Sequence, residues 1–139
     1  MTQTTPSLPP ISDQEAKLPS KPVVARTGST PCTEANLKMR ELRIVGTHEI
    51  TNVWEDLAPK VIAILDAKGV NFITMDVLRF GYEDEPSGNP VVWIGVTPNS
   101  VSYEVGIDAA LQCKELLSEN GLDDVEIEIH ETERWPKYY

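Results

Sequence analysis

The stretch Val91-Val-Trp-Ile-Gly-Val96 is a continuous apolar run, typical of a strand that is buried on both faces of a sheet. The residues before it, Glu83–Pro90, form turns readily, and Phe72–Tyr82 before those is rich in β-branched and aromatic residues. This order predicts an antiparallel hairpin, and the apolar character of 91–96 favours that strand as the centre of the sheet, with 72–82 as the alternative centre.

A helix is expected on the amino-terminal side of this hairpin. Apolar residues recur there at spacings of three and four, at Trp54, Leu57, Val61, Ile62 and Leu65. Asn52 followed by Glu55 resembles a capping box, and Gly69 is a typical C-terminal stop. Pro59 inside the pattern predicts a kink, or a helix that begins near Ala58.

A second helix and a last strand are expected after the hairpin. Ser102 is a candidate N-cap and Gly121 a stop signal, and Cys113 shares the helical spacing of the apolar residues between them. The following segment, 124–130, alternates in polarity. Its parity turns three side chains to the core, Val125, Ile127 and Ile129, and turns three away from it, Glu126, Glu128 and His130.

These elements predict a two-layer α+β domain over residues 47–139 in the order helix-strand-strand-helix-strand. Two helices would cover one face of a sheet of about three strands, with the last two strands parallel through a right-handed crossover. Six of the 11 prolines lie in residues 1–31, so residues 1–46 are predicted to be a disordered Pro/Ser/Thr-rich arm. Within this arm, residues 37–45 could form a short helix or strand before Gly46.

Length and charge narrow the class of protein. The chain has 139 residues, enough for one domain, and a formal net charge of −10 with a pI of about 4.6. Residues 1–46 carry six basic and four acidic residues (+2), and residues 47–139 carry six and eighteen (−12). The acidic body argues against nucleic-acid binding.

The sequence also lacks an apolar run of membrane-spanning length and a signal-peptide pattern, so a cytoplasmic protein is expected. The two cysteines, Cys32 and Cys113, are expected to be free thiols.

No residue pattern predicts a cofactor, a metal or a catalytic group. Glu126, Glu128 and His130 could supply metal ligands from one face of a strand, but alternating acids are more often the solvated face of an edge strand. Ser100 or Cys113 with His48 or His130 could form a nucleophile and base, yet no nucleophile elbow is present. Asp76 and Arg79 lie on opposite faces of their strand by parity.

Two candidate sites remain. The loop Gly95–Ser102 joins a buried strand to a helix N-terminus, where Asn99, Ser100 and Ser102 could bind an anion, although glycine is sparse. The other is the sheet face away from the helices, where parity places Phe72, Leu78, Phe80 and Tyr82. The aromatic segment 135–139 would either cover that face or add to an exposed patch.

Four stretches within residues 48–133 resemble the amino-terminal region of a family of uncharacterised fungal proteins. They are Asp76-Val-Leu-Arg-Phe-Gly, Val91-Val-Trp-Ile-Gly-Val-Thr-Pro-Asn-Ser, Cys113-Lys-Glu-Leu-Leu and Asp124-Val-Glu-Ile-Glu-Ile-His-Glu131. In longer members this region precedes one that is faintly similar to trypsin-like peptidases. The resemblance implies an accessory module or a shortened relative, with any catalytic apparatus outside these residues, and it assigns no site.

The sequence therefore favours a non-enzymatic intracellular interaction module whose protein partner is unknown. The alternative is a small ligand-binding or enzymatic domain that uses the loop Gly95–Ser102. A third reading is a homo-oligomer formed through the free sheet face or edge.

Overall fold

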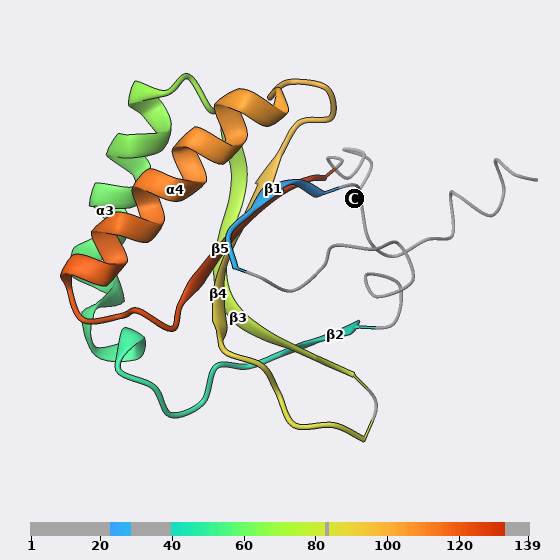
Figure 1. Cartoon of the computed structure of the whole chain (residues 1–139), viewed down its shortest axis with the longest axis vertical. Coiled ribbons are helices and arrows are strands. Elements are labelled where there is room, and N and C mark those ends of the chain that lie inside the picture. The colour runs from blue at the N-terminus through green and yellow to red at the C-terminus, as the bar shows by residue number, and fades with distance from the viewer. Residues whose placement is uncertain (1–22, 29–39, 83, 133–139) are drawn as a thin grey trace, which may run out of the picture.

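The structure is a computed structural model, and it describes residues 23–28, 40–82 and 84–132. This part of the chain contains two helices and five strands (Figure 1). In chain order they are β1 (Val23–Arg26), β2 (Arg40–Arg43), α3 (Ile50–Ala67), β3 (Phe72–Tyr82), β4 (Pro90–Val96), α4 (Tyr103–Glu119) and β5 (Glu126–Glu131).

All five strands form one mixed sheet in the order β1-β5-β4-β3-β2. The β3–β4 hairpin is antiparallel and β4 pairs in parallel with β5, as predicted, and β4 is the central strand. The expected number of strands was wrong, because β2 adds to β3 on one side and β1 adds to β5 on the other, both antiparallel. β1 lies within the predicted disordered arm, so strands from both sides of the expected boundary at residue 47 build the sheet.

The sequence did not predict β1 and β2 as strands of the sheet, because both are short and have no long apolar pattern. β1 and β2 have four residues each, and β2 reads Arg-Glu-Leu-Arg. Their place in the sheet comes from backbone pairing with longer neighbours, which composition does not reveal.

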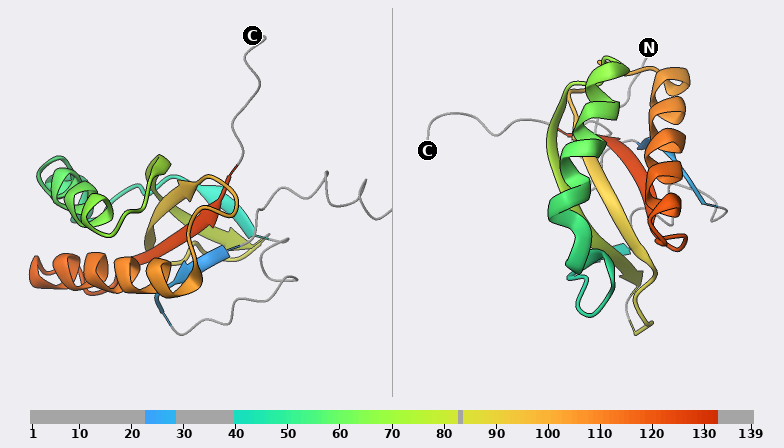
Figure 2. Two further views of the ribbon diagram at one scale, coloured as in Figure 1. Left: turned by 90° about the horizontal axis from the view of Figure 1, so that it is seen from above. Right: turned by 90° about the vertical axis from the view of Figure 1, so that its left-hand side faces the viewer.

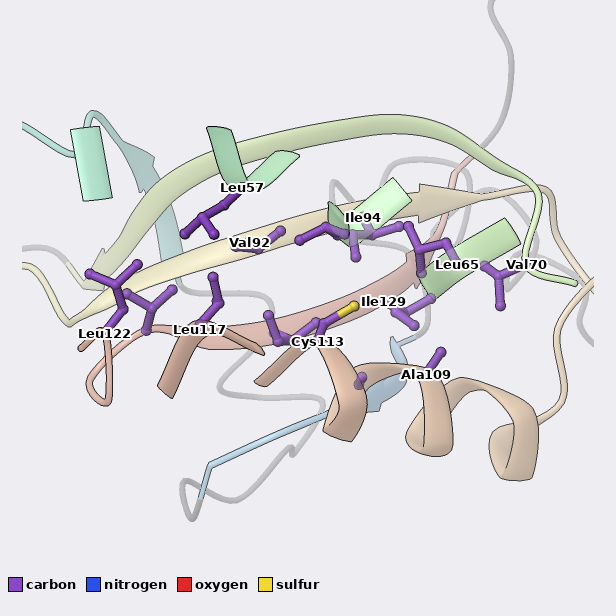
Figure 3. Close-up of a cluster of buried hydrophobic side chains, with 14 of the residues drawn as sticks. Leu57, Leu65, Val70, Val92, Ile94, Ala109, Cys113, Leu117, Leu122 and Ile129 are labelled. Carbon is purple, nitrogen blue, oxygen red and sulfur yellow. The ribbon is translucent and has the colours of Figure 1, made fainter. Parts of the chain in front are cut away.

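The two helices cover the same face of the sheet, as expected, and no helix of the described residues lies on its other face (Figure 2). The core lies between the helices and the sheet (Figure 3). Val92 and Ile94 of β4 meet Leu65 of α3 and Leu117 of α4 there, and all four are fully buried. The predicted core positions of the last strand, Val125, Ile127 and Ile129, are fully buried as well.

The helices begin and end where the sequence predicts, except that the start of α3 differs. Gly69 and Gly121 have φ of +76° and +81° after α3 and α4, as C-terminal stops require. Ser102 caps α4 by accepting a hydrogen bond from the Val105 amide at 3.2 Å. α3 begins at Ile50 rather than near Ala58 and includes Pro59.

The predicted capping box of α3 is not formed. The amide of Ile50 instead donates to Nδ1 of His48 at 3.0 Å. The histidine two residues before thus accepts a hydrogen bond from the first amide of the helix, which has no partner within the helix. Neither helix of the described part of the chain has the length and apolarity to cross a bilayer.

Candidate functional site

The candidate site is the helix-free face of the sheet, which we call the open face. Strand pairing brings side chains from all five strands to this face, because cross-strand partners point the same way. Trp93 lies opposite Asp76 on one side and Glu128 on the other, and Phe80 lies opposite Leu42. The open face therefore carries aromatic, aliphatic and charged groups together.

A buried carboxylate lies at the centre of the open face. Glu128 of β5 is only 1% exposed. Arg40 of β2 donates to its two oxygens at 3.0 and 2.5 Å, and Nε1 of Trp93 donates to one of them at 3.0 Å. Nη1 of Arg26, from β1, lies 4.0 Å from the other oxygen. This bidentate pairing satisfies a charge that would be very costly to bury alone.

Aromatic rings surround this ion pair. The ring of His130 stacks on Trp93 with 3.9 Å between the centroids, and Phe80 meets Trp93 edge-on at 5.7 Å. The guanidinium of Arg40 lies 3.8 Å from the centroid of the Phe80 ring, a cation–π contact. Side chains from all five strands thus form one layer, which we call the Glu128 cluster: Arg26, Arg40, Phe80, Trp93, Glu128 and His130.

Gly95 provides space for the histidine in this layer. It lies opposite His130 in the β4–β5 register. A Cβ at this position would come within 2.5 Å of Thr74 Oγ1, 2.8 Å of Thr132 Cγ2 and 3.3 Å of His130 Nε2. A side chain at residue 95 would therefore clash with Thr74 and Thr132 and would crowd the imidazole of His130.

The burial of His130 has an electrostatic consequence. It is 4% exposed, and desolvation lowers its pKa to about 4 against the opposing effect of the Glu128 carboxylate. Nδ1 of His130 and Nε of Arg26 are buried without a hydrogen-bond partner among the described residues. The imidazole is therefore neutral at neutral pH.

These positions correct the interpretation of Glu126, Glu128 and His130 as the solvated face of an edge strand. β1 covers the outer side of β5, so β5 is internal to the sheet. Both oxygens of Glu128 are occupied by Arg40 and Trp93, and Glu126 accepts from the Thr27 hydroxyl. The sequence could not reveal this, because the partners Arg26 and Arg40 lie about 90 to 100 positions away in the chain.

The loop Gly95–Ser102 makes contacts within the protein. Asn99 has a φ of +64°, and its amide donates to the carboxylate of Glu131 at 2.8 Å. Ser100 donates to the Thr97 carbonyl at 2.6 Å, and Ser102 caps α4. A carboxylate of the chain itself thus occupies the position predicted for an anion.

The candidate nucleophile and base are also engaged. Nε2 of His48 lies 2.9 Å from Asp124 Oδ2, and this hydrogen bond lowers the pKa of Asp124. Because Nδ1 of His48 accepts from the Ile50 amide, the ring has no free basic nitrogen. Cys113 is fully buried, and desolvation raises the pKa of its thiol to about 12. It is a core residue, as predicted.

Three of the four residues predicted on the open face lie there in the strand register. Leu78, Phe80 and Tyr82 are half-buried, and they lie opposite Val91, Leu42 and Arg40. Phe72 was misplaced: a register shift between Phe72 and Thr74 breaks the alternation, and Phe72 packs against the core. Cys32 and the segment 135–139 lie outside the described residues.

Comparison with family models, curated proteins and solved structures gives no significant match to this chain.

Proposed function

We propose that this chain is a non-enzymatic interaction module that binds a protein partner on the open face of its sheet. The observation that carries the proposal is the surface around Phe80. There, half-buried Phe80, Leu78 and Tyr82 lie beside Leu42, which is 56% exposed. Aromatic and aliphatic groups next to an arginine are the composition that interface centres favour.

The Glu128 cluster supports this function by fixing the shape of the face. Its bidentate ion pair and stacked rings hold Arg40, Phe80 and Trp93 in one arrangement. Side chains that are already ordered lose less conformational entropy on binding, so the same contacts give a higher affinity.

The candidate catalytic groups outside the open face already have partners within the protein or are buried, which favours binding over catalysis. His48, Cys113 and the loop hydroxyls are each occupied in a hydrogen bond or buried in the core. The net charge of −12 on residues 47–139 favours a partner that presents an apolar surface with basic residues around it.

The test is affinity capture from a native cell lysate with the full chain as bait, quantified by mass spectrometry. Leu78→Glu places a charge on the open face without removing a member of the Glu128 cluster. Ser100→Ala is the matched control on the distant loop, where the hydroxyl bonds only the Thr97 carbonyl. We expect a stoichiometric protein that is captured by the wild type and by Ser100→Ala and is lost with Leu78→Glu.

Both variants are first checked by circular dichroism and thermal unfolding. Capture of the same partner by a folded Leu78→Glu variant would contradict binding on the open face. Absence of any partner above background would contradict the proposal as a whole.

A further inference from the structure

The outer edge of β2 is the feature that carries a further inference. β2 is a terminal strand of the sheet, and among the described residues only β3 pairs with it. Leu42 is 56% exposed, and Ile44, just beyond the strand, is 86% exposed, the highest value among the exposed large apolar residues of the described chain. A strand edge with exposed aliphatic residues is a template for pairing with another strand.

The pairing of β2 with β3 shows which of its backbone groups are free. The carbonyl of Phe80 accepts from the Gly88 amide, on the β4 side of β3, so the backbone groups of Phe80 point away from β2. Its neighbours Arg79 and Gly81 therefore bond to β2, where their partners are Arg43 and Glu41. By alternation, the amide and carbonyl of Leu42 point outward.

The side chains around Leu42 are complementary to a second copy of themselves. In a two-fold antiparallel pairing centred on Leu42, the Leu42 residues of the two copies lie opposite each other and exchange two backbone hydrogen bonds. Glu41 of each copy then lies opposite Arg43 of the other, and Arg40 lies opposite Ile44. Two opposite-charge pairs and one apolar pair result, and cross-strand pairs of both kinds stabilise sheets.

The groups that would form these pairs are accessible. The side chain of Glu41 is 54% exposed and that of Arg43 is 25% exposed, and they already contact each other at 3.1 Å. Arg43 is also held by the carbonyls of Tyr82 and Glu85, and its guanidinium lies over Gly81 of β3.

We propose that this chain forms a homodimer by antiparallel pairing of two β2 edges, which joins the two five-stranded sheets into one. This inference goes beyond the proposed function, because it names a second copy as the partner of the edge and leaves most of the open face free.

Sedimentation velocity of the purified full chain over a range of concentrations tests the dimer. We expect a monomer–dimer equilibrium for the wild type and a monomer for Leu42→Pro. Proline removes the outward amide of Leu42, which β3 does not use, so the fold is retained while the pairing is blocked. Leu42→Thr, the matched control, keeps the amide and is expected to dimerise more weakly than the wild type but measurably.

A charge variant tests the register separately. Glu41→Lys would lie opposite Arg43 of the second copy, and we expect it to raise the dimer dissociation constant about tenfold. A wild-type chain that stays monomeric at all concentrations, or a folded Leu42→Pro variant that dimerises like the wild type, would overturn the proposal. Because pure protein is used, these outcomes are independent of any partner captured from a lysate.

Discussion

Glu128 is the residue with the greatest influence on the open face. It is a buried carboxylate on a strand whose sequence alternates like a half-solvated one, and residues distant in sequence supply its partners. Parity correctly predicted which side of β5 it occupies. Its burial could not be predicted, because it depends on β1 completing the sheet and on Arg40 reaching across β3 and β4.

Removal of Arg40 should lower the stability of the folded chain, because the buried Glu128 carboxylate then lacks its main partner. We expect Arg40→Met to lower the free energy of unfolding by about 3 kcal/mol, because it leaves a buried charge without its main partner. Arg40→Met combined with Glu128→Leu should recover much of that loss, since no unpaired charge remains. Urea unfolding of Arg40→Met, of Glu128→Leu and of the double variant measures the interaction energy between the two side chains. Additive losses would contradict a direct ion pair.

His130 should make stability depend on pH. Its pKa is about 4 in the folded chain and near 6.5 when unfolded, so the unfolded chain binds more protons between these values. The free energy of unfolding therefore rises with pH across this window, and protonation of His130 alone lowers it by about 2 kcal/mol at pH 4.5 relative to pH 7. The charged groups that act on the ring are Glu128, Arg40 and Asp76.

The matched variant is His130→Phe, which keeps an aromatic ring beside Trp93 but does not titrate. Denaturant unfolding at several pH values should show a shallower slope between pH 4.5 and 7 for this variant than for the wild type. Equal slopes would contradict the low pKa of His130.

The elements show where sequence patterns succeed and where they fail. The long elements α3, β3 and α4 were predicted because each buries a periodic apolar stripe against the core, and β4 because its apolar run is continuous. β1 and β2 were missed or left open because four residues carry no usable period. Phe72 was placed on the wrong face because the register shift in β3 leaves no mark in the composition.

The N-cap of α4 is a feature that the sequence predicted and the structure contains. Ser102→Ala removes the acceptor for the Val105 amide and should lower the free energy of unfolding by about 1 kcal/mol. Ser102→Asp should restore most of it, because aspartate also caps and its charge favours the helix N-terminus. Thermal unfolding checks both variants, and an unchanged midpoint for Ser102→Ala would show that this hydrogen bond contributes little.

At the scale of the whole molecule, the amino-terminal third of the chain supplies both outer strands of the sheet. β1 brings Arg26 and β2 brings Arg40 to Glu128, so the expected domain 47–139 lacks two strands and both basic residues of the cluster. The open face, and with it the proposed binding surface, depends on these strands.

Urea unfolding of two shortened chains, followed by tryptophan fluorescence, tests this dependence most directly. A chain without residues 1–22 keeps β1 and β2, and we expect it to unfold cooperatively with a stability close to that of the full chain. A chain without residues 1–46 should lose at least about 3 kcal/mol, or fail to unfold cooperatively, because it lacks both outer strands and both arginines that pair with Glu128. Equal stability of the two shortened chains would contradict the account.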